Sequence, residues 1–535
     1  MPRYAYKSYP YTKPPELTGG KVSDAPVVIV GAGPVGLAAA IDLAQHGIAS
    51  VVLDDNDVVS VGSRAICWAK RTLEIFDRLG VGERMVEKGV TWKVGRLFHG
   101  DREVYAFDLL PEPGHKNPAF INLQQYYVEE YLVDRCADFP DLIDLRWKNR
   151  VIAVRQSGNT VVTFVDTSDG TYTIEAAYLL ACDGAKSSVR EMLGLEFAGR
   201  VFEERFLITD VEMKADFPSE RWFWFEPQFH NGQSALLHKQ PDDIYRIDLQ
   251  LGWNADPEEE RKPENVIPRI RAIVGDREFE IDWVSVYTFQ CRRLERFVHD
   301  RVIFAGDSAH VVSPFGARGG NGGIQDTDNL CWKLAMVLKG QANQRLIETY
   351  DEERTVGADE NILNSTRATR FMTPADGAER LFRDETLALA ETMPFARRLI
   401  NSGRLSLPCS LAGMSLAIPD SENVPGGLVP GAPCVDAPVL GNGKPAWLLD
   451  RLGGAFLQMT VSQDTITLAN VAPDGSLGEM RSLACDTNNT AANRYAPDTP
   501  VTYLVRPDQH IAARSNAATQ QWRIIAMQHI LGGAA

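Results

Sequence analysis

A cluster of glycines near the N-terminus has the spacing of a dinucleotide-binding turn. Residues 31–36, Gly-Ala-Gly-Pro-Val-Gly, fit the pattern G-x-G-x-x-G. In such a turn the first glycine permits a tight bend, the second lets a pyrophosphate approach the backbone, and the third allows a helix to pack closely on a strand. We therefore predict that a dinucleotide binds at Gly31, Gly33, Pro34, Val35 and Gly36.

Two acidic residues lie where such a site needs a ligand for ribose. Asp54 and Asp55 end the apolar run 51–53, and Asp54 follows Gly36 by 18 residues (54 − 36 = 18). An acid about 20 residues after the turn is expected to bind ribose hydroxyls. FAD and NAD carry the same adenosine diphosphate half, so this spacing does not distinguish them.

The residues around the turn predict the elements that would position it. An apolar run at 27–30, helical character at 37–45 and the run at 51–53 describe the strand, helix and strand of a parallel sheet. Two further apolar runs, 174–182 and 301–305, each end at an Asp-Gly or Gly-Asp pair. We expect both to join the same sheet.

A second layer is predicted between these runs. Residues 201–284 contain strand-like stretches rich in aromatic and β-branched residues, with one helical pattern near 266–274. This composition favours a mostly antiparallel sheet. After Asn321 a long helical pattern runs through Leu330, Leu334 and Leu338, and one side of it is expected to face the core.

Composition and charge exclude several classes of protein. Lys+Arg 55 against Asp+Glu 71 gives a net charge of −16, which repels phosphate backbones and anionic lipid, so we expect no nucleic-acid or membrane partner. The first two dozen residues have no apolar signal region, and no stretch reaches the length of a membrane span. Eight cysteines without a C-x-x-C pair fit a cytoplasmic chain with reduced thiols, and we predict no metal site.

Three further segments resemble the single-component FAD-dependent aromatic hydroxylases, the group of phenol hydroxylase and 3-(3-hydroxyphenyl)propionate hydroxylase. These segments are 63–65 (Ser-Arg-Ala), 182–190 (Cys-Asp-Gly-Ala-Lys-Ser-Ser-Val-Arg) and 301–310 (Arg-Val-Ile-Phe-Ala-Gly-Asp-Ser-Ala-His). The resemblance covers most of residues 26–375. It identifies the dinucleotide as FAD, bound tightly and without a covalent link.

The resemblance also implies roles for individual residues. Asp183 would contact the cofactor region and the pyridine nucleotide, Gly306 and Asp307 would hold the ribityl chain, Arg64 would neutralise cofactor phosphate, and Gln125 would touch the flavin side from the start of a helix. A carboxylate such as that of Asp307 accepts hydrogen bonds from ribityl hydroxyls with charge-assisted strength.

A glycine-rich loop is expected to face the isoalloxazine ring. Pro314, Gly319, Gly320 and Asn321 lie just before or at the start of the long helix. The free N–H groups and positive end of that helix would stabilise negative charge on the reduced flavin.

Two residues near this loop need separate interpretation. Many relatives have Gly-Gln where this chain has Ala317-Arg318. We expect Arg318 to pair with a neighbouring carboxylate, the alternative being a cation near the flavin. His310 is expected to be a packed, hydrogen-bonded neighbour of the cofactor loop rather than a general base.

The activity implied by the resemblance is hydroxylation of a small phenolic substrate. NAD(P)H would reduce FAD, and O₂ would form a flavin C4a-hydroperoxide whose distal oxygen attacks the ring; NADH and NADPH remain open. A base near the ring hydroxyl is expected, and the sequence does not identify it. His238, Tyr245 and Arg246 are candidates, whereas Trp222 and Trp224 are expected to serve sheet packing.

The predicted fold class is α/β: a Rossmann-like FAD-binding domain interleaved with a mostly antiparallel β-sheet substrate domain, followed by a thioredoxin-like C-terminal domain. That last domain resembles the tail of phenol hydroxylase relatives but lacks C-x-x-C, so packing or oligomer contacts, including those of a homodimer, are its expected role. The boundaries are 1–24 for an N-terminal arm; 25–94, 120–200 and 285–375 for the FAD domain; 95–119 and 201–284 for the substrate domain; 376–424 for a helical segment and linker; and 425–535 for the C-terminal domain.

Three other functions remain as alternatives. Residues 222–227, Trp-Phe-Trp-Phe-Glu-Pro, resemble the W-x-W-x-I-P motif of flavin-dependent halogenases, although Glu226 replaces the apolar residue. An FAD-dependent dehydrogenase or oxidase, and a non-catalytic FAD-binding protein, are the other two.

Overall fold

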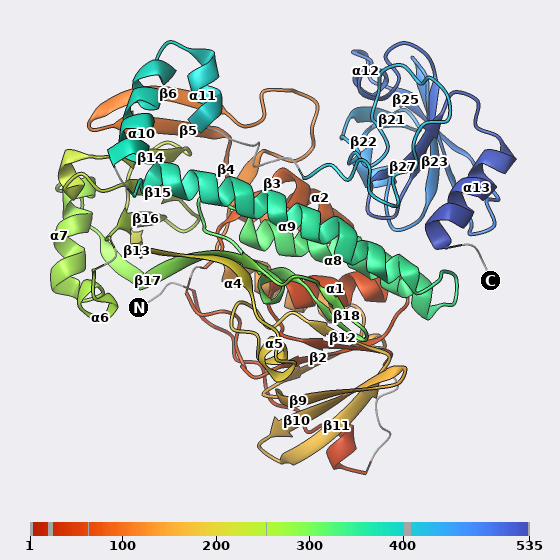
Figure 1. Cartoon of the computed structure of the whole chain (residues 1–535), viewed down its shortest axis with the longest axis horizontal. Coiled ribbons are helices and arrows are strands. Elements are labelled where there is room, and N and C mark those ends of the chain that lie inside the picture. The colour runs from red at the N-terminus through yellow and green to blue at the C-terminus, as the bar shows by residue number, and fades with distance from the viewer. Residues whose placement is uncertain are drawn as a thin grey trace.

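The structure is a computed structural model that describes residues 4–19, 25–62, 64–252, 254–375, 377–400 and 408–532. It contains three units, which Figure 1 shows side by side. The blue C-terminal unit lies on one side, an eight-stranded sheet with α7 and α10 on the other, and the long helices α8 and α9 run between them.

The first unit is built on a six-stranded sheet in the order β18-β19-β12-β1-β2-β8, parallel except for β18. Its strands are β1 (Val27–Val30), β2 (Ser50–Asp54), β8 (Ile143–Trp147), β12 (Tyr178–Ala181), β18 (Val298–His299) and β19 (Val302–Phe304). The predicted strands at 27–30, 51–53 and 301–305 therefore join one parallel sheet. Of the run 174–182, only β12 does so.

Two small antiparallel sheets and most of the helices complete this unit. The sheets are β3 (Cys67–Ala69), β7 (Phe120–Asn122) and β4 (Val90–Trp92), and β9 (Arg150–Ser157), β10 (Thr160–Thr167) and β11 (Gly170–Ala176). The helices are α1 (Pro34–Gln45), α2 (Lys70–Leu79), α3 (Gly82–Lys88), α4 (Gln125–Cys136), α5 (Ser188–Met192), α8 (Gly319–Leu338) and α9 (Arg345–Met372), with 3-10 turns η1 (Pro15–Leu17) and η3 (Gly306–Ser308).

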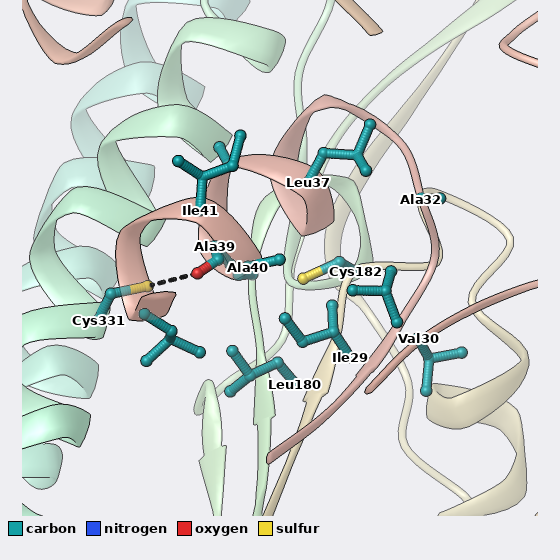
Figure 2. Packing of buried hydrophobic residues seen from close by; sticks show 14 of the residues in the cluster. Ile29, Val30, Ala32, Leu37, Ala39, Ala40, Ile41, Leu180, Cys182 and Cys331 are labelled. Carbon is teal, nitrogen blue, oxygen red and sulfur yellow. Dashed lines mark hydrogen bonds between the residues drawn. The ribbon is translucent and has the colours of Figure 1, made fainter. Parts of the chain in front are cut away.

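The core of the first unit forms where α1 packs on the sheet and on α8. Ile29 and Leu180 point from neighbouring strands toward α1, where Ala39 and Ala40 leave room for close approach (Figure 2). The Cys331 thiol of α8 donates a hydrogen bond to the carbonyl of Ala39 over 3.7 Å. Small residues on α1 thus allow α8 to lie against it, which fixes where the N-terminus of α8 points.

The second unit is an eight-stranded sheet in the order β20-β17-β13-β16-β15-β14-β5-β6, antiparallel except for the β14–β5 pair. Its strands are β5 (Val94–His99), β6 (Arg102–Asp108), β13 (Ala198–Glu212), β14 (Arg221–Phe225), β15 (Ala235–Lys239), β16 (Ile244–Gln250), β17 (Glu280–Arg293) and β20 (His310–Val311). Its helices are α6 (Pro257–Glu260), α7 (Pro263–Val274), α10 (Gly377–Ala390) and α11 (Pro394–Ile400), with η2 (Gln228–His230). The mostly antiparallel second layer is therefore confirmed.

The two faces of this sheet are covered by different helices. Val266, Ile270 and Val274 of α7 pack on one face, and Leu387 and Ala396 of α10 and α11 share a cluster with the other. Residues 377–400, which the sequence assigned to a helical segment and linker, thus pack as part of this unit.

The third unit is a seven-stranded sheet in the order β22-β21-β25-β24-β23-β26-β27, whose named pairs are all antiparallel. Its strands are β21 (Pro438–Gly441), β22 (Lys444–Trp447), β23 (Leu457–Val461), β24 (Thr465–Asn470), β25 (Arg481–Cys485), β26 (Val501–Val505) and β27 (Ile511–Ser515). Its helices are α12 (Thr490–Tyr495) and α13 (Gln520–Leu531), with η4 (Leu449–Arg451). The likeness to thioredoxin therefore does not extend to a parallel βαβ unit.

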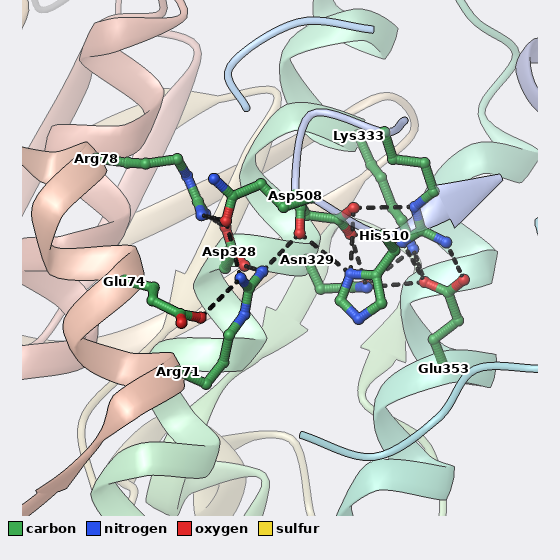
Figure 3. Close-up of polar contacts among 11 residues, drawn as sticks. Arg71, Glu74, Arg78, Asp328, Asn329, Lys333, Glu353, Asp508 and His510 are labelled. Atoms are coloured by element: carbon green, nitrogen blue, oxygen red, sulfur yellow. Dashed lines mark hydrogen bonds and ion pairs between the residues drawn. The ribbon is translucent and has the colours of Figure 1, made fainter. Parts of the chain in front are cut away.

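A buried network of charged groups joins the third unit to the first (Figure 3). The Arg506 guanidinium donates to both carboxylate oxygens of Glu353, at 2.5 and 2.9 Å, and the Lys333 ammonium lies 2.7 Å from the same carboxylate. Arg71 of α2 donates to the carbonyl of Asp508 and pairs with Asp328 of α8. The loop 506–510 is thereby held against α2, α8 and α9.

The N-terminal arm lies on the first unit. Tyr4 stacks on Tyr126 of α4, and Tyr9 stacks on Trp147 of β8. Residues 1–3 and 20–24 of the predicted arm lie outside the described residues. Over the part of the chain that is described, none of the helices is both long and apolar enough to cross a membrane.

Candidate functional site

The glycine turn between β1 and α1 has the shape that its spacing predicts. A Cβ on Gly36 would lie 2.0 Å from the carbonyl oxygen of Gly31, and a Cβ on Gly31, where φ is +104°, would lie 2.5 Å from that of Cys182. A Cβ on Gly33 would meet nothing within 4 Å. Helix and strand therefore touch at the first and third glycines, while the second faces open space at the start of α1. A pyrophosphate could approach there.

Asp54 braces this turn as well as ending β2. Its carboxylate accepts hydrogen bonds from the N–H of Ala32 at 2.6 Å and of Asn56 at 2.9 Å. The neighbouring Asp55 is exposed and accepts from the Asn56 side chain. The carboxylate of Asp54 lies beside the glycine turn, where a ribose next to the pyrophosphate could be bound.

Gln125 fixes the loop that carries Arg64. The Gln125 amide oxygen accepts from the N–H of Ala65 at 3.0 Å, and its amide nitrogen donates to Glu129 at 2.7 Å. Glu129 is buried, which raises its pKa, and it also accepts from the backbone and hydroxyl of Ser60. Arg64 itself is exposed. Gln125 therefore positions the loop that carries this exposed cation. The sequence interpretation missed Glu129. Its position four residues after Gln125, on the same face of a helix, could have indicated this contact.

Asp183 follows β12 and has one carboxylate oxygen without a partner. Its Oδ2 accepts from the N–H of Val189 at 3.1 Å and the hydroxyl of Ser188 at 3.2 Å. Its Oδ1 is buried and has no hydrogen bond to any described residue. An unpaired buried oxygen is costly, so this atom is a candidate acceptor for a ligand hydroxyl.

Asp307 is exposed beside a buried polar network that shapes its loop. Asp326 of α8 accepts from the N–H of Gly306 at 2.9 Å, from His310 Nε2 at 2.7 Å and from Arg354 Nε at 2.7 Å. Burial raises the pKa of Asp326, and His310 and Arg354 outweigh it, so that pKa lies below its usual value. His310 is thus packed beside the loop as expected, and Asp307 remains open to a ligand.

The N-terminus of α8 meets both of these loops. A Cβ on Gly319 would lie 3.8 Å from Asp307 Oδ1, one on Gly323 would lie 2.6 Å from Val35, and one on Gly320 would lie 3.2 Å from Trp68. Segments 31–36, 306–307 and 319–323 therefore converge. The first-turn N–H groups of a 20-residue helix face this junction with their partial positive charge.

The other two predicted residues of this loop, Asn321 and Pro314, lie in different surroundings. The Asn321 side chain accepts from the N–H of Ala69 at 2.8 Å and donates to the carbonyls of Cys67 and Ala317 at 2.9 and 2.5 Å. These hydrogen bonds clamp β3 to α8. They use both polar atoms of the Asn321 side chain, so it has little capacity left to bind a ligand. Pro314 is exposed in the loop before α8.

The expected ion pair of Arg318 is wrong. The guanidinium is 7% exposed and donates from Nη1 to Asn361 Oδ1 at 3.1 Å, and no carboxylate lies within 4 Å of it in the described part of the chain. Burial lowers its pKa, with Glu360 acting in the opposite sense from farther away. The preceding Ala317 holds a φ of +52°, a left-handed conformation that favours glycine. That turn directs the Arg318 side chain toward α9.

The second sheet carries a row of buried polar side chains across four strands. Arg221 of β14 is opposite His238 of β15, His238 is opposite Arg246 of β16, and Arg246 is opposite Asp210 of β13. Directly opposite residues share a face. The structure thus brings His238 and Arg246 together and adds Arg221, Asp210 and Asp248, which sequence reasoning missed. Their signal was a polar residue at alternate positions of otherwise apolar strands.

Tyr245, Trp222 and Trp224 lie on the opposite face. All three pack in the cluster beneath α7, and the Tyr245 hydroxyl donates to the carbonyl of Ala215 at 2.7 Å. Tyr245 is therefore separated by the sheet from the other two base candidates. The two tryptophans serve sheet packing.

Three members of the polar row have unused hydrogen-bonding atoms. Arg221 is 3% exposed, and its Nε and Nη1 have no partner among the described residues; the same is true of His238 Nε2 and Asp248 Oδ1. His238 Nε2 lies 3.7 Å from Asp248 Oδ2, beyond hydrogen-bond range. Burial, and then Arg221, lowers the pKa of His238 to about 4. The row therefore combines a neutral imidazole with an unpaired cation.

Apolar contacts connect this row to the loop before α8. Cys67 lies 4.0 Å from His238 Nδ1 and shares a cluster with Ala317 and Phe107. On the same face of the sheet, Phe315 packs against Phe206 and Phe289. Cys67 thus contacts the polar row and packs in the same cluster as Ala317 of the loop expected to face the flavin.

The donor set fits FAD. Space at Gly33, a free acceptor on Asp183, an exposed Asp307 and the N-terminus of α8 offer what a pyrophosphate, ribityl hydroxyls and a reduced ring require. The assignment of individual residues to the cofactor stays a prediction.

Comparison with known proteins points to the same cofactor as the geometry of the site. A family model described as an FAD binding domain matches residues 24–365. A flavin-dependent monooxygenase of Mycobacteroides abscessus is 34% identical over 378 residues, covering 66% of this chain and 76% of its own. A 3-(3-hydroxy-phenyl)propionate/3-hydroxycinnamic acid hydroxylase of Burkholderia cenocepacia is 27% identical over 522 residues, covering 92% and 94%.

Solved structures share the fold over nearly the whole chain. The flavin-dependent monooxygenase PieE, crystallised with FAD and substrate, is 22% identical and matches with a TM-score of 0.79, covering 95% of this chain and 99% of its own. Aklavinone-11 hydroxylase with FAD and aklavinone is 21% identical with a TM-score of 0.75, covering 96% and 100%.

Proposed function

The chain belongs to the FAD-binding-domain family of flavin-dependent aromatic hydroxylases, and from this premise we propose that it hydroxylates a phenolic ring whose hydroxyl group binds at the Arg221–His238–Asp248 row. NAD(P)H and O₂ are the co-substrates. One oxygen atom enters the ring and the other leaves as water, with two electrons supplied by NAD(P)H.

The first unit would hold the cofactor with groups from five segments. Gly31, Gly33, Pro34, Val35 and Gly36 accommodate the pyrophosphate at the start of α1, with Asp54 and Asp55 near the ribose. Asp307, beside Gly306, is the proposed ligand of the ribityl chain, with Asp183 and Arg64 as further polar contacts. Gln125 and Asn321 would position the loops around the isoalloxazine ring. Pro314, Gly319 and Gly320 would border that ring.

FAD, when bound, supplies the two-electron chemistry that activates O₂. The chain's own task is to protect that chemistry from water and to present an electron-rich ring. The aromatic side chains of Phe206, Phe289 and Phe315 line the apolar face beside the loop, which suits an aromatic ligand and excludes water.

The observation that carries the proposal is the unpaired Arg221. A buried guanidinium without an anion is costly, because desolvation is not offset by a paired charge. Its neighbour Arg246 is compensated by Asp210 at 2.9 Å, whereas Arg221 has no carboxylate within 4 Å among the described residues and lies over the ring of Phe223, 4.8 Å from its centroid. A phenolate oxygen would complete its hydrogen bonds and balance its charge.

Neutral His238 is placed to accept a hydrogen bond from the phenol hydroxyl, but its lowered pKa makes it a weak base, so transfer of the phenol proton to it requires that Asp248 stabilise the imidazolium and Arg221 the phenolate. With its pKa lowered to about 4 it is neutral near pH 7, and Nε2 can accept. Protonation would turn the 3.7 Å approach to Asp248 into an ion pair, and Arg221 would stabilise the phenolate left behind. Deprotonation matters because a phenolate ring is far more electron-rich than a phenol.

The test is turnover of the FAD-loaded protein with a panel of phenols, in which NAD(P)H consumption, labelled oxygen from O₂ in the product, and the pH profile are measured. Arg221→Gln and His238→Asn are expected to lower kcat/KM by about 10²-fold or more and to move the profile toward the pKa of the free phenol. Both variants should retain bound FAD.

Tyr245→Phe is the matched control, since Tyr245 lies on neighbouring strand positions but on the other face. It should leave the pH profile unchanged. If Arg221→Gln and His238→Asn hydroxylate phenols with the wild-type profile, the row does not receive the phenol. If no oxygen enters any product, the hydroxylase assignment itself is wrong.

A further inference from the structure

A small pocket lies between the start of α8, α9 and residues 408–409. Its volume is about 20 Å³, and its lining includes Arg318, Asn321 and Gln325, with Arg354, Asn361 and Cys409. A space of this size holds roughly one water-sized sphere. It is separate from the polar row of the second sheet and from the glycine turn.

Among the described residues, the lining includes two arginines and no Asp or Glu. Arg354 is compensated outside the pocket by Asp326 at 2.7 Å. Arg318 has no such compensation: it is 7% exposed, its Nη1 binds an amide oxygen of Asn361, and its Nε is buried without a partner in the described chain. The pocket therefore carries about one uncompensated positive charge in a protein whose net charge is −16.

Helix α8 adds to the positive charge of the pocket. Arg318 is the N-cap of α8, a helix of 20 residues, so the partial positive charge of the helix end lies at the same place. Amide groups of Asn361 and Gln325 add further polar contacts. An anion there would meet a guanidinium N–H and a helix N-terminus.

We infer that this pocket is a binding site for a small monovalent anion of the halide type, held by Arg318 at the start of α8. A water molecule would fill the space but leave the charge of Arg318 uncompensated. Phosphate at neutral pH would carry more charge than the single positive charge of the site, and the volume of about 20 Å³ favours the smallest anions. One halide ion matches both the volume and the single charge.

The inference can be tested on the FAD-loaded protein with bromide as the probe. Crystals grown in bromide should show an anomalous peak beside the Arg318 side chain in the pocket, and Arg318→Gln should lose it. In solution, bromide at constant ionic strength should raise the thermal midpoint of the wild type, because a ligand that binds only the folded state stabilises it. Arg318→Gln should need about tenfold more bromide for the same rise.

Arg296→Gln serves as the matched control, because it removes an exposed cation that already pairs with Glu348 and Asp351. It should respond to bromide like the wild type. Electron density for water without an anomalous signal, or an equal bromide response in Arg318→Gln and the wild type, would overturn the inference. An anomalous peak that persists in Arg318→Gln would do the same.

Discussion

At the scale of single residues, two glycines of one turn are required for different physical reasons. Gly36 is needed for packing, since a Cβ there would lie 2.0 Å from the backbone oxygen of Gly31. Gly33 faces open space and has an ordinary φ of −77°. The protein alone therefore tolerates a side chain at Gly33 and not at Gly36.

This difference leads to a paired prediction. Gly36→Ala should destabilise the fold by about 1–3 kcal/mol or more through overpacking, measured by denaturant unfolding of the cofactor-free protein. Gly33→Ala should leave that stability close to wild type and yet weaken FAD binding, measured by flavin fluorescence. Equal FAD affinity in Gly33→Ala and wild type would show that the pyrophosphate does not approach there.

The buried His238 predicts how the free energy of unfolding depends on pH. Its pKa is lowered from 6.5 to about 4, chiefly by burial, so as pH falls the unfolded chain takes up the proton before the folded one does. The contribution of His238 to the free energy of unfolding is therefore complete above about pH 6.5. As pH falls toward 4, the free energy of unfolding decreases by on the order of 3 kcal/mol.

His238→Gln should flatten this dependence when the free energy of unfolding is measured across that range. His529→Gln is the control, because His529 is exposed on α13. An unchanged slope in His238→Gln would mean that His238 is not neutral in the folded protein.

At the scale of elements, α8 links the cofactor junction to the sheet of the substrate side. Its Asn321 side chain satisfies the N–H of Ala69 and the carbonyl of Cys67 in β3, and Cys67 in turn approaches His238. The position of β3, and with it the loop that carries Arg64, depends on this clamp.

Asn321→Ala should therefore cost about 1–3 kcal/mol, because it leaves buried backbone groups unpaired, and should weaken FAD binding in the same variant. Thermal unfolding and flavin fluorescence measure the two effects. Asn493→Ala, on the exposed side of α12, is the control. A stability loss with unchanged FAD affinity would show that the clamp does not shape the cofactor site.

At the scale of the whole molecule, the C-terminal unit is tied to the FAD-binding unit by charge rather than by apolar contact alone. Glu353 is fully buried, yet Arg506 and Lys333 outweigh the effect of burial and hold its pKa at about 2. Removal of one partner from such a network leaves an uncompensated buried charge.

Arg506→Met should thus lower the free energy of unfolding by about 3–5 kcal/mol and make the C-terminal unit more sensitive to limited proteolysis. Arg296→Met, which breaks an exposed pair with Glu348, should cost no more than about 1 kcal/mol. Similar losses in the two variants would mean that the junction depends on other contacts.

Much of this protein was determined by local sequence. The turn at 31–36, the strands of the parallel sheet and the mostly antiparallel second layer could be predicted because spacing and periodicity are properties of consecutive residues. Asp307 and Gln125 could be proposed as cofactor residues because their motifs are short and contiguous, and that assignment stays a prediction.

Only the tertiary structure decided which side chains meet. Asp326 reaches Gly306 and His310 from a later helix, and Arg221 stands opposite His238 because of strand register. The failed ion pair of Arg318 has the same origin, as a left-handed Ala317 turns the guanidinium toward Asn361 and away from carboxylates. Burial and charge compensation depend on neighbours distant in sequence, and these determine whether a polar residue is free to act.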